Sequence, residues 1–254
     1  MKKMIFCFAL LAVLFPASAS ADNYIRGDVD HNGRVNIADV SGLIDYLLSG
    51  TWGYDEHEYV DLGLPSGTLW ATMNIGALAP YDFGNYFLWG EVETKALFNW
   101  TTYKWCDGTD ETLTKYCTDA SYGSVDNKSE LEPEDDAAYV NWGPSWRMPT
   151  SEQFQELIDY CTWESVSNHG VNGNWITGPS GNTIFLPCAG YRTDASYIGT
   201  GDYGIYWSRT LSNSNRPDLA RSLHIMKFGV SAVQCVSDYR AYGATVRPVL
   251  MQQQ

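Results

Sequence analysis

The sequence has few basic residues. Lysine and arginine together number 16, against 30 aspartates and glutamates, so the formal net charge at pH 7 is −14. Proteins that bind nucleic acid or an anionic membrane need a basic surface, because contacts with phosphates supply much of the binding free energy. The charge balance therefore argues against both of these partners. It favours neutral or cationic ligands, or calcium.

Histidine is also scarce, and the usual motifs of catalytic sites are missing. None of the four histidines, His31, His57, His169 and His224, lies in an H-E-x-x-H pattern or in another cluster of metal ligands. His224 alternates with apolar neighbours, so we expect it to face outward. Residues 199–204 match G-x-G-x-x-G, but a strand-like run follows them, which predicts a turn and not a phosphate site. A Ser–His–Asp triad could still assemble from distant residues, but we expect a protein that is not an enzyme.

A long hydrophobic run occurs only at the start of the chain. Residues 5–15 are apolar, Lys2 and Lys3 precede them, and small residues follow at 19–21, a pattern typical of a secretory signal peptide over Met1–Ala21. The run is too short for a stable membrane span, and Cys7 lies inside it, where a lipid anchor would not form. Its removal leaves 14 basic and 30 acidic residues, a net charge of −16. We expect a secreted, extracellular or cell-surface protein whose mature chain has no transmembrane span.

Cysteine is limited to five residues after the signal peptide, an odd number that leaves at least one thiol free. Export permits disulfides. The candidate pairs are Cys106 with Cys117, which are close in sequence, and Cys188 with Cys235, which both lie in strand-like runs. Cys161 would then be a buried thiol. The sequence does not determine the connectivity.

The most specific local pattern is a calcium loop within Gly27–Gly50. Oxygen-bearing residues recur at the spacing that a twelve-residue calcium loop requires, and Gly33 permits its sharp turn. A helix with an apolar stripe is expected from about residue 38 to 48. The alternative is a solvated turn before a helix. The predicted Ca²⁺ ligands are Asp28, Asp30, Asn32, Arg34 through its backbone carbonyl, Asn36 and Asp39.

This stretch resembles one repeat of a type I dockerin, with Asp39 at the twelfth loop position as dockerins prefer. The resemblance implies Ca²⁺ as cofactor and a cohesin-like domain as a partner, often within polysaccharide-degrading assemblies. Dockerins carry two repeats and this chain carries one, which could pack on its own domain, dimerise or be completed by a partner. The length allows one large domain with a small appendage. We therefore divide the chain into a signal peptide (1–21), the calcium repeat (22–50), a linker (51–57) and a main domain (58–254).

The main domain is expected to form around one helix within Ser145–Cys161. Thr150 and Gln153 have the spacing of a capping box, and Phe154, Leu157, Ile158 and Cys161 form one apolar face. An acid-rich run, Asp126–Asp136, could do acid–base work or bind a second Ca²⁺, or it could be a solvated loop. Strands are predicted on both sides of a turn at 64–67, at 86–91, in a hairpin over 163–175, at 183–190, and near 205–207, 223–226, 230–236 and 244–249.

Several separated motifs carry a resemblance to known families. SWRMPT followed by the helix resembles the helix entry of formylglycine-generating-enzyme-like domains. The motifs VDLGLPSGTLWATMNIGA, YFLWGE, FLPCAGYR and GATVRPV resemble the Fibrobacter succinogenes major paralogous domain family, over about Tyr59–Val249. The resemblance implies an α+β, C-type-lectin-like domain of short antiparallel strands and loops around one main helix. The oxidase of the wider group uses two nearby cysteines, and Cys188 and Cys235 do not match that motif.

The C-terminal loops are the expected ligand surface, because ligand contacts concentrate on loops of a rigid scaffold. Aromatic rings would stack on the ligand, and arginine and asparagine would form directional hydrogen bonds. Tyr203 and Trp207 could instead belong to the core. The predicted ligand residues are Tyr197, Tyr203, Trp207, Arg209, Asn213, Asn215, Arg216, Tyr239 and Arg240.

The function expected from these patterns is that of a non-catalytic binding protein for a glycan or a surface partner. The calcium repeat would link it to polysaccharide-degrading assemblies. One alternative is an interaction module that uses the repeat and carries the main domain as cargo. A second is a divergent oxidase or glycan hydrolase, whose activity would depend on Cys188 or on the acids of Glu132–Asp136.

Overall fold

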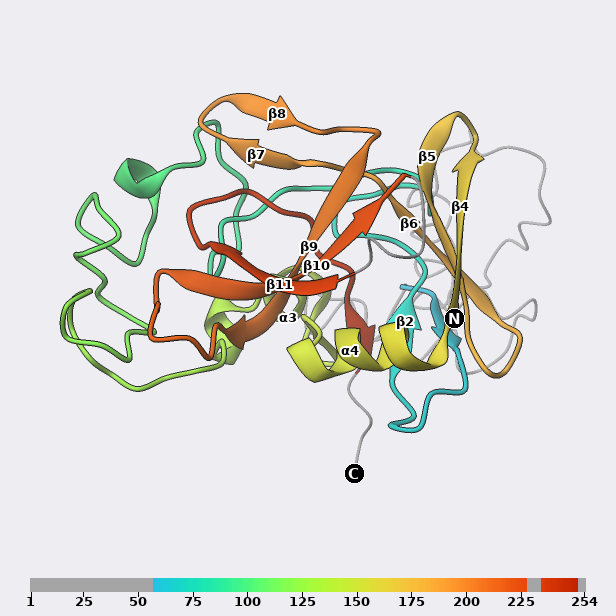
Figure 1. Cartoon of the computed structure of the whole chain (residues 1–254), viewed down its shortest axis with the longest axis horizontal. Coiled ribbons are helices and arrows are strands. Elements are labelled where there is room, and N and C mark those ends of the chain that lie inside the picture. The colour runs from blue at the N-terminus through green and yellow to red at the C-terminus, as the bar shows by residue number, and fades with distance from the viewer. Residues whose placement is uncertain (1–56, 228–233, 251–254) are drawn as a thin grey trace, which may run out of the picture. The chain divides into compact units, whose positions relative to one another are not determined.

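Short antiparallel strands make up most of the regular structure in the part of the chain that the computed structural model describes, residues 57–227 and 234–250 (Figure 1). These residues belong to one unit, His57–Gln254. They are mainly β-structure with few helices, so the expected α+β class overstated the helical part. The predicted signal peptide, the calcium repeat with all six predicted ligands, and linker residues 51–56 lie outside the described residues.

The first sheet brings together distant parts of the described chain. It contains β1 (Tyr59–Asp61), β2 (Leu69–Ala71), β12 (Val249–Leu250) and β3 (Trp146–Arg147), in the order β1-β2-β12-β3. All three pairings are antiparallel. The turn between β1 and β2 is closed by a hydrogen bond from Gly67 N to Leu64 O of 2.9 Å, which confirms the predicted turn.

The second sheet has the order β11-β10-β9. It consists of β9 (Tyr203–Leu211), β10 (Leu219–Met226) and β11 (Gln234–Tyr239), all antiparallel. The strands predicted near 205–207 and 223–226 are confirmed within longer strands. Of the predicted strand 230–236, only the part from Gln234 onward is described. The predicted strand 244–249 is mostly irregular, and only β12 at its end is a strand.

The third sheet is a meander of β4 (Thr162–Asn168), β5 (Val171–Thr177) and β6 (Thr183–Pro187). The first two strands form the predicted hairpin. Ile184, Phe185 and Leu186 are buried, as the apolar run predicted. A separate hairpin consists of β7 (Tyr191–Thr193) and β8 (Ser196–Ile198), drawn at the top of Figure 1.

The longest described helix is α4 (Ser151–Tyr160), and it begins where its capping residues predicted. Thr150 Oγ1 accepts from Gln153 N at 3.2 Å, and Gln153 Oε1 accepts from Thr150 N at 2.8 Å. Phe154 and Leu157 are fully buried, and each contributes roughly 1.5–3 kcal/mol through the hydrophobic effect. The other helices are short: α3 (Ala137–Trp142) and the 3₁₀ turns η1 (Trp100–Thr102) and η2 (Pro133–Asp135). No described helix is long and apolar enough to span a membrane.

The core lies between these elements and is rich in aromatic rings. Trp70 of β2 stacks on Phe154 of α4, with 5.7 Å between ring centroids.

The predicted strand at 86–91 is wrong, since Phe87 forms a single bridge to Ala244. Residues 86–89 are all buried and do not alternate between core and solvent. Their backbone carbonyls accept side-chain donors, such as Trp207 Nε1 on Phe87 O at 2.9 Å. This segment is therefore an interior loop.

Candidate functional site

A pocket of about 500 Å³ opens beside the β9–β10–β11 sheet. Side chains of all three strands, of β7 and of the loop after β11 contribute to its wall. We call it the tyrosine pocket. Its lining residues are Tyr191, Tyr203, Ile205, His224, Ile225, Met226, Gln234, Asp238 and Tyr242.

Three tyrosine rings form one side of the tyrosine pocket. Tyr191 lies 6.1 Å from Tyr203 and 4.9 Å from Tyr242, measured between ring centroids. Burial raises the pKa of Tyr203 to about 12, with further contributions from neighbouring Tyr191, Asp238 and Asp202. Burial also raises the pKa of Tyr242. The phenols of Tyr203 and Tyr242 therefore stay neutral at physiological pH, and all three rings present flat, amphipathic faces.

A histidine–carboxylate pair lies next to these rings. His224 on β10 and Asp238 on β11 project from the same face of the sheet, because His224 pairs with Gln234 and side chains alternate along a strand. His224 Nε2 lies 2.7 Å from Asp238 Oδ2, and the Ser222 hydroxyl donates to the same oxygen. His224 is 31% exposed, so the expectation that it faces outward is only partly right.

The geometry of this pair differs from that of a catalytic triad. In a triad the imidazole bridges the hydroxyl and the carboxylate, so that it can take the proton of the nucleophile. Here the carboxylate of Asp238 bridges Ser222 and His224, and Ser222 is fully buried. The hydroxyl therefore has no contact with the base that would activate it. What the pair offers instead is hydrogen-bonding capacity at the edge of an aromatic pocket.

The structure places the predicted ligand residues in different surroundings. Tyr203 lines the tyrosine pocket, and Tyr239 lies 5.5 Å from Tyr242 and is 37% exposed. Tyr197 of β8 is 59% exposed, and its ring lies 4.5 Å from the guanidinium carbon of Arg192. Tyr239 therefore adjoins the pocket through Tyr242, whereas the contacts of Tyr197 are Arg192 and Tyr86 and lie outside the pocket.

The polar predicted residues lie away from the tyrosine pocket. Arg209 pairs with Glu130 at 3.3 Å, and Arg216 donates to the Asp218 carboxylate at 2.5 and 2.8 Å. Asn213 lines a second, smaller cavity of about 250 Å³ beside the start of α4. Asn215 is exposed in the loop between β9 and β10. None of these four lines the tyrosine pocket.

Two of the predicted ligand residues are core residues, and their assignment to a surface was wrong. Trp207 has no exposed surface, because it lies on the covered face of β9 and donates through its indole N–H to Phe87 O. Arg240 also has no exposed surface. Arginine is rarely buried unless its donors are paired, and here four protein acceptors surround it.

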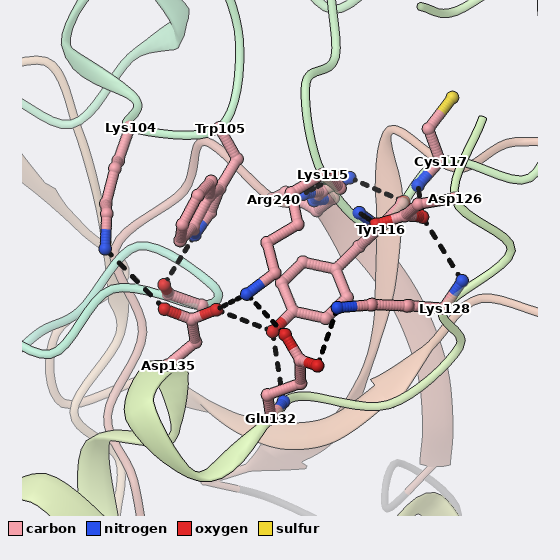
Figure 2. Close-up of polar contacts among 11 residues, drawn as sticks. Lys104, Trp105, Lys115, Tyr116, Cys117, Asp126, Lys128, Glu132, Asp135 and Arg240 are labelled. Carbon is pink, nitrogen blue, oxygen red and sulfur yellow. Dashed lines mark hydrogen bonds and ion pairs between the residues drawn. The ribbon is translucent and has the colours of Figure 1, made fainter. Parts of the chain in front are cut away.

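Arg240 is the centre of a second polar cluster, which we call the Arg240 network (Figure 2). Its guanidinium donates to the Tyr103 hydroxyl at 2.8 Å and to three backbone carbonyls at 2.9–3.1 Å. The carbonyls belong to Tyr116, Pro217 and Lys115. The guanidinium carbon also lies 4.9 Å from the ring of Trp89. Through these hydrogen bonds, the Arg240 side chain connects the loop around residues 103–117 to the end of β11.

Acidic residues extend the same network. Lys115 Nζ lies 2.6 Å from Glu132 and 2.5 Å from Asp135, and the Tyr116 hydroxyl donates to Asp135 at 2.6 Å. Burial alone would lower the pKa of Lys115, but its bonds to Asp135 and Glu132 raise it. A lysine held in its charged form is neither a general base nor a nucleophile. The role of the Arg240 network is therefore structural and not catalytic.

The acid-rich run at 126–136 is a solvated loop only in part: Glu130 and Glu134 are exposed, whereas its aspartates accept from protein donors. Asp126 accepts from the backbone N–H groups of Tyr116 and Cys117 at 2.9 Å each, as Figure 2 shows for part of the cluster. Asp136 is fully buried, caps α3 and accepts from Met148 N. Because these oxygens are occupied by protein donors, neither acid–base work nor a second Ca²⁺ site is supported here. Within residues 57–227 and 234–250, no group of three or more potential metal ligands occurs.

The candidate disulfides are not formed, and all five cysteines between residues 57 and 250 are free. The Cys106 thiol donates to Trp100 O, and the Cys117 thiol donates to Asp119 O. Cys188 is buried in the core, whereas Cys235 of β11 is half-buried and contacts Ser151 O at 3.8 Å. Cys161 is half-buried and not fully buried as expected. Burial raises the pKa of Cys161 and of Cys188 to about 11, so neither is a reactive thiolate.

The sequence patterns missed Tyr191, Tyr242, His224 and Asp238 as parts of one site. Tyr242 lies three residues after Tyr239, and this aromatic spacing was the available signal. The contribution of Tyr191 depends on the β7–β8 hairpin, which no sequence pattern had predicted.

Comparison of the chain with protein-family models, curated proteins and solved structures finds no match. The geometry of the tyrosine pocket and the sequence motifs are therefore the observations that bear on function.

Proposed function

We propose that this protein is a non-catalytic binding protein that recognises a glycan through the tyrosine pocket. The observation that carries the proposal is that three tyrosine rings and a histidine–carboxylate pair line the same open cavity. Sugars have apolar C–H faces and polar hydroxyl edges. A flat aromatic wall beside hydrogen-bonding groups is complementary to both.

The neighbouring aromatic residues support a site longer than one sugar. Tyr239 packs edge-on against Tyr242 and also against Trp100, at centroid distances of 5.5 and 6.4 Å. Tyr239 is 37% exposed, so its ring is accessible to a ligand that extends from Tyr242. An oligosaccharide could therefore stack on the pocket with one residue and on Tyr239 with the next.

The wider architecture that we propose is a C-type-lectin-like domain. Antiparallel strands, interior loops and the capped α4 support it, together with the SWRMPT and GATVRPV motifs. The divergent oxidase has less support, because Cys188 is buried and its pKa is raised to about 11. A glycan hydrolase that uses the acids of Glu132–Asp136 has less support too, because Glu132 and Asp135 belong to the Arg240 network and Asp136 caps α3, which leaves only the exposed Glu134.

The predicted calcium repeat supports a second, separate proposal, which concerns the partner that the protein docks to after export. The residue spacing from Asp28 to Asp39 supports a Ca²⁺-dependent contact with a cohesin-like partner, and the signal-peptide pattern supports export. Asp28→Ala combined with Asp30→Ala should abolish calcium-dependent capture of such a partner. Capture that persists in this variant would contradict the docking role and leave the glycan proposal untouched.

A glycan array tests the proposed function directly. The chain from residue 22 onward is screened with calcium and again with chelator, alongside Tyr242→Ala and a control, Tyr160→Ala. Tyr160 is 55% exposed on α4 and does not line the tyrosine pocket, so its loss removes a ring of the same kind elsewhere. We expect specific hits that Tyr242→Ala loses and Tyr160→Ala keeps. A blank array, or hits that Tyr242→Ala retains in full, would contradict the proposal.

A further inference from the structure

We propose that the tyrosine pocket selects sugars that carry a free amine over N-acetylated and acidic sugars. This inference rests on the proposed function and names its ligand class. It follows from three properties of the pocket: its hydrogen-bond acceptors, its charge and its aromatic wall.

The first property is the unused acceptor capacity of the His224–Asp238 pair. His224 Nε2 lies 2.7 Å from Asp238 Oδ2, so this nitrogen is the donor of the hydrogen bond, and in a neutral imidazole the other ring nitrogen, Nδ1, is an acceptor. Asp238 Oδ2 accepts from both His224 and Ser222. Each carboxylate oxygen has two lone pairs, so Asp238 Oδ1 can accept further hydrogen bonds. The pair therefore offers acceptors to a ligand, and an amine supplies donors in either of its protonation states.

The second property is the charge of the lining. Asp238 contributes a carboxylate, while the described lining contains no lysine or arginine. The nearby Asp202 is itself paired with Lys227 at 3.9 Å, so this pair adds no net charge. A ligand carboxylate or sulfate would meet Asp238 without a lysine or arginine in the described lining to compensate its charge, which is unfavourable at short range. The pocket thus disfavours acidic sugars and favours cationic ones.

The third property is the aromatic wall. The faces of tyrosine rings carry partial negative charge and attract ammonium groups. Tyr191, Tyr203 and Tyr242 bring three such rings to the pocket that also holds Asp238. An N-acetyl group would replace the ammonium by a neutral amide, and it would lose both the ring attraction and the charge-assisted hydrogen bond. The difference between amine and acetamide should therefore be visible in affinity.

The test compares three oligosaccharides of equal length by titration calorimetry at neutral pH: a glucosamine oligomer, its fully N-acetylated counterpart and a galacturonate oligomer. We expect the glucosamine oligomer to bind at least about tenfold more tightly than the N-acetylated one, the size of one charge-assisted hydrogen bond. Asp238→Asn should reduce this preference to less than about twofold. Glu164→Gln makes the same charge change on the exposed side of β4, and it should keep the preference.

A second variant keeps the test decisive if Asp238→Asn fails to fold. Gln234 is exposed at the rim of the pocket, so Gln234→Lys adds a positive charge without burying it. It should weaken binding of the glucosamine oligomer and leave the N-acetylated one unchanged. Equal affinity for the two oligomers, or tighter binding of galacturonate, would overturn the inference while glycan binding stands. No binding of any sugar would overturn both this inference and the proposed function.

Discussion

The tyrosine pocket and the Arg240 network both take residues from β11 and the loop after it, yet their polar groups are used differently. Asp238 belongs to the pocket and Arg240, two residues later, to the network. In the network, the donors of Arg240 and the charges of Lys115 and Asp135 are matched by protein partners. In the pocket, the acceptors of His224 and Asp238 face a cavity. A polar cluster whose donors and acceptors all have protein partners stabilises the fold. A cluster at the surface with acceptors left over can bind a ligand.

The largest expected effect breaks the network at its centre. Arg240→Ala removes the guanidinium donor from four acceptors, three of them in fully buried hydrogen bonds, and creates a cavity beside Trp89. We expect the free energy of unfolding in urea to fall by about 3 kcal/mol or more. Arg209→Ala is the control, because Arg209 pairs with the half-exposed Glu130 and should cost about 1 kcal/mol or less. Equal costs for the two variants would contradict the structural role of Arg240.

Asp135→Asn tests the acidic side of the same network and should have the next largest effect. It removes the charge that Lys115 and the Tyr116 hydroxyl contact, and an amide donor would then oppose Lys115. We expect a loss of about 2 kcal/mol in the same urea experiment. Glu134→Gln, at the exposed neighbouring position, should change stability by less than about 0.5 kcal/mol. A null result for Asp135→Asn would show that the network contributes little.

Alkaline titration distinguishes the two regions, because burial raises the pKa values of their tyrosines to different extents. Burial raises the pKa of Tyr203 in the pocket to about 12, and it raises the pKa of Tyr103 in the network further. Because these folded-state values exceed the unfolded value of about 10, their stabilising contribution is complete below pH 10 and is lost as pH rises through the folded pKa. Absorbance at the tyrosinate band should show Tyr203 ionising in the folded chain. Tyr103 should ionise only on unfolding, and simultaneous ionisation of both would contradict this order.

The smallest effect is expected from a reducing agent. Cys106 and Cys117 flank the Arg240 network as free thiols, and Cys161, Cys188 and Cys235 are free as well. Dithiothreitol should therefore leave the thermal unfolding midpoint unchanged. In denaturant without reductant, the chain from residue 22 onward should expose five reactive thiols. Three or fewer thiols, with a midpoint that falls on reduction, would show a disulfide and contradict the structure.

Local chemistry made parts of the fold predictable. Thr150 and Gln153 mark the start of α4 because a capping box is formed by residues three apart. The turn at Leu64–Gly67 is equally local. The segment at 86–91 was mistaken for a strand because an apolar run looks the same in an interior loop as in a buried strand.

The candidate site was less predictable, because long-range contacts form it. The hydroxyl that Arg240 contacts belongs to Tyr103, 137 residues earlier in the sequence, so nothing near Arg240 indicated burial. Tyr203 and Tyr239 were identified from aromatic content. Tyr191 and the His224–Asp238 pair were not, because only the pairing of β7 with β8 and of β10 with β11 brings them into place.

The most direct test of the account maps ligand contacts onto both regions at once. A labelled chain is titrated with a glycan identified on the array, and backbone amide shifts are followed by NMR. We predict that the largest shifts occur at His224, Asp238 and Tyr242, while Lys115 and Tyr116 stay unchanged. Shifts centred on the Arg240 network with a silent tyrosine pocket would contradict the assignment of the binding site.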